Sequence, residues 1–398
     1  MASDFTAATL AYNAWLSTYL TLDPVGLAEK RRKMDKKKGF PFLRGSFHRW
    51  SWQFGATDAL VRDAPVVLST GDAHLENFGT WRDAEGRLVW GVNDFDEAAE
   101  LPFTSDLVRL AASFLVARRD EEGMILAGAE EGVAAILEGY RDGLAGGRPF
   151  ILDEAKHETI RAVALARHDP AGEWDDIRSK GDEQAPSDPE VLHLLLTSLP
   201  QGARPETFRR PLRGLGALGR PRWTVIADWN GGPVAREAKA TAPSAIVMPA
   251  RPASRITDHR RLAAEARRAP DPAFCVAERW VVRRLSPEAR KIRLGDFLPD
   301  GSDGTETPGG SRSAPRVPVL DPGRGQLTLL RAMGGEIANV HAGTAHDPGV
   351  LSAWLAERHG TWLLRAAERA GERVAEDHAA FRRAPEVVEM LSPSHLIG

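Results

Sequence analysis

Two short polar segments, joined by a strand–turn–strand pattern, constrain the fold of this chain more than any other feature. The first, residues 71–77 (GDAHLEN), follows an apolar run at residues 64–70 that has the length and composition of a buried strand. The second, residues 93–96 (NDFD), ends another strand pattern at residues 87–93, which is entered through the turn sequence DAEG. We therefore expect the second segment to lie beside the end of the first strand.

The residue types in these segments suit metal-assisted phosphoryl transfer. Asp72 and Asn77 can converge on one site from a loop that leaves a strand. The Asp72 carboxylate can orient an attacking hydroxyl or accept its proton, and the amide oxygen of Asn77 can bind Mg²⁺, which prefers oxygen ligands. Asp94 offers a second metal-binding group. Phosphoryl transfer needs this combination of one Asp for the nucleophile with an Asn and an Asp for the metal.

Other polar residues of the two segments have more than one interpretation. His74 is a candidate catalytic residue, although a hydrogen-bonding role within the loop is favoured because Asp72 already fits the role of base. Asp96 and Glu76 could each be a further metal ligand or a solvated carboxylate, and we favour Asp96 as the ligand. In the blandest interpretation, Asp72 only caps a turn and Asp94 only ends a strand.

Bulk composition argues against several function classes. The chain has 398 residues, of which 42% are hydrophobic and 27% charged, and its net charge of −3 creates no global field for nucleic acid or an anionic membrane. No apolar run approaches the roughly 18 residues of a membrane-spanning helix. Cys275 is alone, and its apolar neighbours predict a buried thiol. We therefore expect a cytoplasmic protein that binds neither nucleic acid nor membrane.

The chain divides by texture into helical, β-rich and helical parts. Residues 1–200 are expected to form a helical catalytic lobe, and residues 201–298 a small β-rich nucleotide-binding lobe. Residues 299–318 are expected to be a flexible loop, and residues 319–398 to be helices that complete the catalytic lobe. The polar residues 170–190, rich in Asp, Glu, Pro and Gly, suggest a loop or a lobe boundary.

The polar segments resemble motifs of known phosphotransferases. The pattern Gly71-Asp72-x-His74-x-x-Asn77 resembles the catalytic loop of aminoglycoside- and choline-kinase-like enzymes. Residues 94–96 resemble their metal-binding Asp motif, which corresponds to the Asp-Phe-Gly of protein kinases. Residues 106–110 (DLVRL) resemble the helix that follows and supports the catalytic loop.

Over nearly its full length, the chain looks most like the bacterial family of unknown function called DUF2252. The segments that carry this resemblance are residues 42–45 (FLRG), 71–79 (GDAHLENFG), 93–98 (NDFDEA), 236–239 (REAK) and 283–287 (RRLSP). Together the two resemblances imply an α+β, protein-kinase-like fold of two lobes, with ATP and Mg²⁺ as cofactors, and they imply no particular substrate.

A glycine-rich segment comes late in the chain. Gly214, Gly216 and Gly219 form a GxGxxG pattern, which opens a Rossmann unit when a strand precedes it and a helix follows it. Here a strand pattern at residues 223–227 follows instead. That order suits the glycine-rich hairpin of kinases, whose backbone amides lie over the ATP phosphates.

A cation that pairs with the phosphates is expected on the next strand. Arg236 lies 22 residues after Gly214, similar to the spacing of the kinase lysine, and Lys239 lies three residues farther, on the opposite face of the strand. Spacing slightly favours Arg236, whereas chemistry alone favours Lys239. Glu265, on a helix expected after this strand, could orient the cation or be a solvated helix residue.

The order of the motifs predicts a circular permutation. Residues 333–342 (MGGEIANVHA) resemble a helix that precedes the catalytic loop in aminoglycoside-kinase-like enzymes, yet here they follow it, and the glycine-rich segment is also late. One permutation explains both displacements, because new termini at a surface loop leave the three-dimensional arrangement intact. His341 is then expected to pack in the helix rather than to catalyse.

Three functions follow from these motifs. The leading hypothesis is an Mg²⁺- and ATP-dependent phosphotransferase that acts on an unknown hydroxyl of a small molecule or protein. The second is a nucleotide-binding regulator without turnover, and the third is AMP transfer with the same metal ligands. A calcineurin-like phosphoesterase, whose metal site also opens with Gly-Asp-x-His, is disfavoured because the later motifs of that family are missing.

Overall fold

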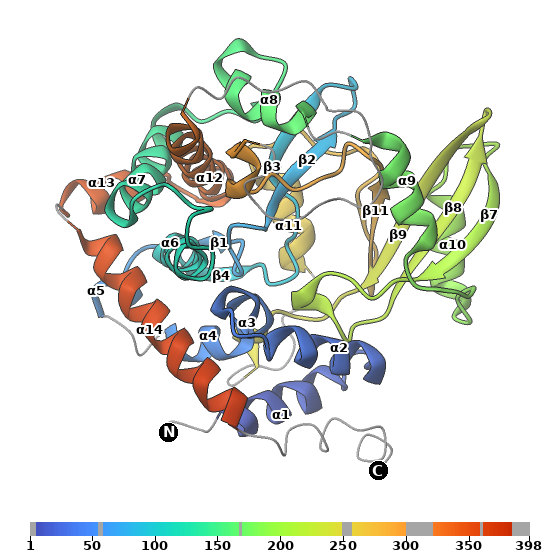
Figure 1. Cartoon of the computed structure of the whole chain (residues 1–398), viewed down its shortest axis with the longest axis horizontal. Coiled ribbons are helices and arrows are strands. Elements are labelled where there is room, and N and C mark those ends of the chain that lie inside the picture. Colours follow the sequence, from blue (N-terminus) through green and yellow to red (C-terminus); the bar gives the residue numbers. More distant parts are fainter. Residues whose placement is uncertain are drawn as a thin grey trace.

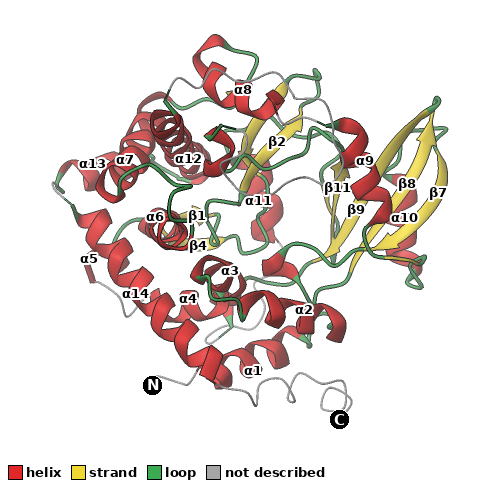
Figure 2. Cartoon of the chain, in the orientation of Figure 1, coloured by secondary structure: helices red, strands yellow, loops and turns green. Residues whose placement is uncertain are grey.

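The structure, a computed structural model, describes residues 5–54, 59–166, 169–248, 257–299, 321–358 and 361–383. It has an α+β fold in which helices predominate and the strands form small antiparallel sheets (Figures 1 and 2). The predicted α+β class is therefore confirmed. The loop expected at residues 299–318 lies, beyond Pro299, outside the described residues.

The helices and strands are distributed along the whole described chain. The helices are α1 (Phe5–Leu16), α2 (Pro24–Met34), α3 (Gly39–Gly45), α4 (Phe47–Phe54), α5 (Ala59–Arg62), α6 (Thr104–Asp120), α7 (Ala129–Gly146), α8 (Glu158–Ala166), α9 (Pro170–Ser179), α10 (Pro189–Thr197), α11 (Thr257–Glu265), α12 (Pro322–Thr344), α13 (Gly349–Ala356) and α14 (Trp362–Arg383). The strands are β1 (Val66–Ser69), β2 (Phe78–Arg82), β3 (Leu88–Val92), β4 (Ala99–Pro102), β5 (Phe150–Ile151), β6 (Asp182–Glu183), β7 (Arg204–Arg210), β8 (Arg222–Trp229), β9 (Gly232–Ala240), β10 (Cys275–Val276) and β11 (Trp280–Leu285). No helix in these described ranges is both long enough and apolar enough to span a membrane.

The helical part of the molecule packs around α6. Leu107, Leu110 and Phe114 follow one another at helical spacing and are fully buried, as their pattern predicts. Helices α7 and α14 pack against α6, and α12 packs against α7 (Figure 1). The late helix α12 therefore shares one hydrophobic core with elements from the first third of the chain.

Two short antiparallel pairs position the polar segments. β1 pairs with β4, and β2 pairs with β3, so residues 71–77 leave β1 and residues 93–96 leave β3. The amide of Asn93 donates to the carbonyl of Asn77 at 3.1 Å, which joins the two segments at the end of the β2–β3 hairpin. The strand–turn–strand prediction is confirmed.

A six-stranded antiparallel sheet lies at one side of the molecule, with the strand order β10-β11-β9-β8-β7-β6 (Figure 1). Its two faces are covered by α9, which precedes the sheet in the sequence, and by α10, which lies between β6 and β7. Leu195 of α10 packs with Val225 on one face, and Ile177 of α9 packs with Ile226 on the other. Because neighbouring strand residues point to opposite faces, the sheet is buried on both sides here.

Two expectations for this region are wrong. Residues 170–190, predicted as a loop or a lobe boundary, are not a loop but contain α9 and the start of α10, because Asp169 and Asp188 each cap a helix whose first residue is proline. The polar composition that suggested a loop includes these start signals. Cys275 is exposed, not buried, because it lies on the two-residue edge strand β10, which pairs only with β11 among the described strands.

Candidate functional site

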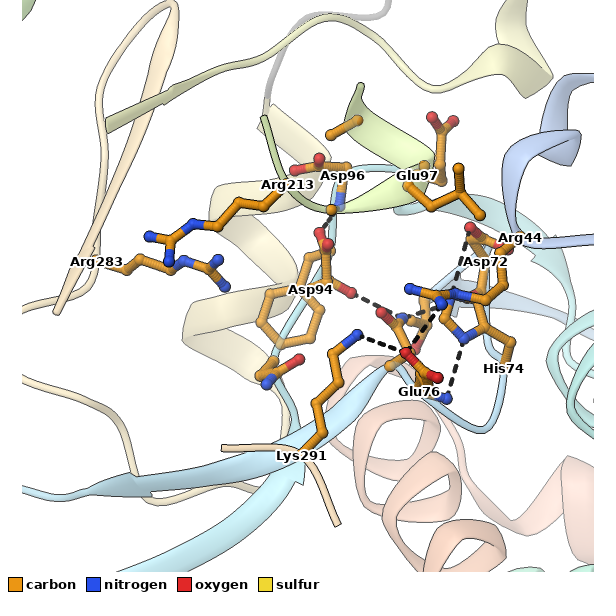
Figure 3. Close-up of a pocket in the computed structure, with 18 of the residues that line it drawn as sticks. Arg44, Asp72, His74, Glu76, Asp94, Asp96, Glu97, Arg213, Arg283 and Lys291 are labelled. Carbon is orange, nitrogen blue, oxygen red and sulfur yellow. Dashed lines mark hydrogen bonds and ion pairs between the residues drawn. The ribbon is translucent and has the colours of Figure 1, made fainter. Parts of the chain in front are cut away.

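One pocket of about 290 Å³ brings both polar segments and the glycine-rich segment together (Figure 3). Its volume is at the lower end of the range for small-molecule sites, roughly 300–1,000 Å³. The candidate site residues that line it are Asp72, His74, Glu76, Asn77, Asp94, Asp96, Gly214 and Gly216, whereas Gly219, Arg236, Lys239 and Glu265 do not. Segments far apart in the sequence therefore form one site.

The start of the 71–77 loop is held by a buried carboxylate. Asp106, in the first turn of α6, accepts hydrogen bonds from the amides of Thr70 at 2.7 Å and Gly71 at 2.9 Å. His341 of α12 lies 3.1 Å from the same carboxylate, and its other ring nitrogen lies 2.9 Å from the hydroxyl of Tyr140. All these side chains are buried, so the loop rests on a rigid polar network.

Asp72 has one oxygen held by an arginine and the other turned to the pocket. Its Oδ1 accepts from Arg109 Nη2 at 2.7 Å, and Arg109 is fully buried between the rings of Phe47 and Trp50. Its Oδ2 lies 3.9 Å from His74 Nε2. Burial raises the pKa of Asp72 to about 7 despite the nearby Arg109 charge. The Asp72 carboxyl can therefore exchange a proton near neutral pH.

His74 contributes to the shape of this loop. Its Nδ1 accepts a hydrogen bond from the amide of Glu76 at 3.1 Å, and its ring packs edge-on against Phe40. Burial and the neighbouring arginine and lysine charges hold the pKa of His74 well below its usual range. A neutral, hydrogen-bonded imidazole suits loop structure better than proton transfer.

Asn77 links the two polar segments. Its Nδ2 donates to the carbonyls of Asp72 at 3.2 Å and Asp94 at 3.1 Å. Because the amide nitrogen makes both bonds, the amide oxygen is the end that can serve a cation. Asp94 Oδ1 accepts from Lys239 Nζ at 3.1 Å. Although burial opposes it, the charges of Lys239 and Arg283 lower the pKa of Asp94 far below its usual value, so this carboxylate stays ionised.

The structure distinguishes the two candidate cations of β9. Lys239 Nζ lies 2.6 Å from Asp96 Oδ2 and 3.1 Å from Asp94 Oδ1, so it pairs with two carboxylates that line the pocket, although Lys239 itself is buried behind them and does not line it. Arg236 lies on the opposite face of the strand, where it donates to the carbonyl of Ser198 at 3.0 Å and does not line the pocket. Glu265 likewise lies away from the site, since it pairs with Arg261 on the exposed side of α11.

The glycine-rich segment connects β7 to β8 and faces Asp72. Residues 215–217 form a short 3-10 turn rather than an extended hairpin tip, and β8 follows, so no Rossmann helix begins here. A Cβ on Gly216 would lie 3.9 Å from Asp72 Oδ2, which shows how closely this backbone approaches the loop. Gly219 instead packs against Leu27 of α2 and does not line the pocket.

The sequence motifs did not predict an arginine cluster that lies at this edge of the sheet. Glu237 is fully buried and accepts hydrogen bonds from Arg213 at 2.7 Å, Arg222 at 2.6 Å and Arg283 at 2.8 Å. All three arginines line the pocket. Strand alternation places Glu237 on the same face as Lys239, two residues later, and this pattern could have identified Glu237 from the sequence.

A second charged cluster surrounds Glu76. Its Oε2 accepts from Arg44 Nη1 at 2.9 Å and lies 3.2 Å from Lys291 Nζ. Despite burial, the Arg44, Lys291 and Arg293 charges lower the pKa of Glu76 to about 2. Glu76 is thus engaged by cations, and Asp96 is also paired, with Lys239 and, at 3.7 Å, with Arg220. In the described residues, no three His, Cys, Asp or Glu side chains form a metal-binding group.

The fold and the site define an α+β protein whose pocket combines a loop aspartate with ionised carboxylates, an asparagine and several arginines. Comparison with protein families points to one family. The family model described as an uncharacterized protein conserved in bacteria (DUF2252) matches residues 22–195, which include both polar segments, and it supports the family that the motifs resemble. Neither the curated proteins nor the solved structures contain a match to the chain.

Proposed function

We propose that this chain is an Mg²⁺- and ATP-dependent phosphotransferase with a kinase-like arrangement of two lobes. One observation carries the proposal: Asp72, Asn77 and Asp94 line a single pocket, and the buried Lys239 of β9 pairs with Asp94 at its wall. In protein kinases, the corresponding four residue types serve as the base, the two metal ligands and the phosphate-binding lysine.

The six-stranded sheet supports a nucleotide-binding role. β7, β8 and β9 are consecutive antiparallel strands, the glycine-rich segment forms the first connection, and Lys239 lies on the third strand. Kinases likewise place a glycine-rich loop over the phosphates and the lysine on their third strand. Arg213, Arg222 and Arg283 surround a single carboxylate, so their surplus positive charge favours binding of the phosphates at this edge of the pocket.

The position of α12 supports the proposed circular permutation. His341 of this late helix reaches Asp106, the residue that holds the catalytic loop. A helix that precedes the loop in aminoglycoside-kinase-like enzymes is therefore proposed to occupy the same place here from the other end of the chain. Under this proposal, residues 1–200 and 319–398 contribute the catalytic lobe, except that α9, β6 and α10 belong with the sheet of the nucleotide-binding lobe of residues 201–298.

The chemistry of the donor set fits Mg²⁺. Asp94 is an ionised carboxylate with an exposed side-chain fraction of 39%, and Asn77, whose amide nitrogen bonds the Asp94 carbonyl, lines the same pocket and supplies an amide oxygen. These two residues would hold the ion, which would neutralise charge on the phosphates. Asp96 is a weaker candidate because its side chain is only 10% exposed, against 39% for Asp94, and lies closer to Lys239.

Asp72 would carry out the proton transfer. The acceptor hydroxyl gives its proton to Oδ2 as its oxygen bonds to the γ-phosphorus, and the bond to the β-phosphate oxygen breaks to release ADP. Arg109 holds Oδ1, so the carboxylate cannot rotate away from the acceptor. Lys239 and the arginine cluster would hold the phosphates during transfer.

ATP turnover of the full chain with Mg²⁺, with ADP and AMP quantified separately, tests the proposal. ADP formation that is lost in Asp94→Asn and retained in Glu265→Gln, a surface control, would support it. Undetectable ATP binding in the unaltered chain would refute it. Binding without turnover would favour the regulator instead, and AMP release with transfer would favour nucleotidyl transfer.

A further inference from the structure

A charged cluster beside Asp72 has more cations than its structural role needs. Arg44 of α3 and Lys291, in the segment after β11, both approach the same oxygen of Glu76. In Figure 3 Arg44 and Glu76 lie to the right of Asp94 and Lys291 lies below it, whereas the guanidinium groups of Arg213 and Arg283 lie to its left. The Glu76 cluster is thus separate from the arginines proposed to bind the nucleotide phosphates.

The cluster has unused capacity to bind an anion. Arg293 approaches the other oxygen of Glu76 at 3.7 Å from the rim, with 63% of its side chain exposed, so one carboxylate faces three cations. Within the described residues, Arg44 Nε is buried without a hydrogen-bond partner. Lys291 contributes an ammonium with three donors, of which Glu76 uses one. Asp296 accepts from the backbone amide of Arg293, and the Asp94 and Glu121 carboxylates act on Lys291 and Arg293, respectively, at longer range.

Like-charge crowding also distinguishes this cluster from an ordinary salt bridge. Burial, followed by the charge of Arg44, lowers the pKa of Lys291 to about 8. Arg44 and Lys291 therefore repel each other where a single cation would have satisfied Glu76. Such an arrangement is costly in the free chain and becomes favourable when a further anion is bound.

We propose that Arg44 and Lys291 bind an anionic group, a phosphate or a carboxylate, carried by the molecule that receives the phosphoryl group. This assignment rests on the proposed phosphotransferase function and names the class of its acceptor. Glu76 lies on the same loop as Asp72, four residues later, and both line the pocket. An acceptor anchored at this cluster can therefore present a hydroxyl to Asp72 Oδ2.

Anion binding to the full chain, measured by calorimetry without nucleotide, tests this subsite directly. Inorganic phosphate should bind, and Lys291→Met should weaken it by about tenfold, because a hydrogen bond to a charged group is lost. Lys291→Arg should restore most of the affinity. Arg293→Met, which removes a cation from the rim of the same carboxylate, should change the affinity by less than about threefold.

Glu76→Gln gives the sharpest distinction between binding and structural roles. Removal of the competing carboxylate should tighten phosphate binding severalfold if the cations serve an anion. If they serve only to hold Glu76, the same change should leave phosphate affinity unchanged or lower it, which would overturn the proposal. Phosphate affinity that Lys291→Met leaves unchanged would also overturn it, because all binding would then belong elsewhere, such as the Arg283 side of the pocket.

Further measurements identify the anion and distinguish failure of this subsite from failure of the proposed phosphotransferase function. Acetate that competes as well as phosphate would assign a carboxylate-bearing acceptor, whereas competition by phosphate alone would assign a phosphorylated one. Sulfate, whose charge is constant in this range, should bind more weakly as the pH rises through about 8 in the unaltered chain and not in Lys291→Met. Lysine-dependent anion binding without ATP turnover would refute the phosphotransferase alone, and ATP turnover without such binding would refute the subsite alone.

Discussion

Lys239 Nζ lies 3.1 Å from Asp94 Oδ1, although 145 residues separate the two in the sequence. This ion pair joins β9 of the six-stranded sheet to the loop that follows β3. The same ammonium lies 2.6 Å from Asp96. This contact connects the sheet to the helical part of the molecule at the proposed site. Substitutions at these residues therefore test the proposed function most directly.

Replacement of Lys239 should separate a phosphate-binding cation from a merely basic strand residue. Lys239→Met should weaken ATP binding by about tenfold or more, since a charged hydrogen bond to phosphate is lost. Arg236→Met is the matched control on the same strand, because its guanidinium faces Ser198 outside the pocket. Equilibrium binding of ATP with Mg²⁺ checks both, and equal losses in the two variants would contradict the assignment.

Asp72→Asn should abolish most turnover and preserve nucleotide binding. Removal of a general base typically lowers the rate by about 10²- to 10⁴-fold. Because the pKa of Asp72 is raised to about 7, the deprotonated, active form increases as the pH rises. The rate of ADP formation should therefore rise with pH and level off above about 7. A rate that is independent of pH between 5 and 8, or a fully active Asp72→Asn, would contradict the role of Asp72 as base.

Glu336 should make the fold less stable at alkaline pH. Burial raises the pKa of this carboxyl from 4.5 to about 7, despite the Asn339 hydrogen bond and the Arg268 charge. Because the folded pKa lies above the unfolded one, its contribution is fully present below pH 4.5 and is lost as the pH rises through 7. Glu336→Gln should be more stable than the unaltered chain at pH 8 by about 1–3 kcal/mol.

Urea unfolding at pH 5 and pH 8 measures this difference. Asn339 Oδ1 is buried without a partner among the described residues, but its Nδ2 donates to the Arg148 carbonyl as well as to Glu336, so a flip that lets this amide accept from the new glutamine exchanges one bond for another. A Glu336→Gln variant that loses as much stability between the two pH values as the unaltered chain would show that another group titrates.

Two glycines with positive φ should differ sharply in their tolerance of alanine. Gly71 has φ +85 and Gly86 has φ +75. A Cβ on Gly71 would lie 1.9 Å from the carbonyl oxygen of Glu97, whereas a Cβ on Gly86 would meet nothing within 4 Å. Gly86→Ala should therefore cost about 1 kcal/mol of backbone strain, and Gly71→Ala about 3 kcal/mol or more. Chemical denaturation compares them, and equal losses would contradict the crowding at Gly71.

Local patterns were predictable where neighbouring residues decide the structure. The strands before residues 71 and 93 and the stripe of Leu107, Leu110 and Phe114 on α6 were all predicted, because apolar periodicity reports burial directly. At residues 170–190, composition was misleading, since a few polar capping residues can start a helix in a region that reads as a loop. Cap residues carry more information there than average polarity.

The sequence by itself determined the local geometry around Asp72, Asn77 and Asp94, because their short spacing and the tight hairpin between them keep these residues close together. Only the tertiary structure decided which cations join them. Strand alternation places Arg236 and Lys239 on opposite faces, but which face is turned to the pocket depends on the packing of α10 and the helical part against the sheet. The same holds for Arg44 and Lys291, which both contact Glu76. No local sequence pattern predicts that the two segments carrying them come together.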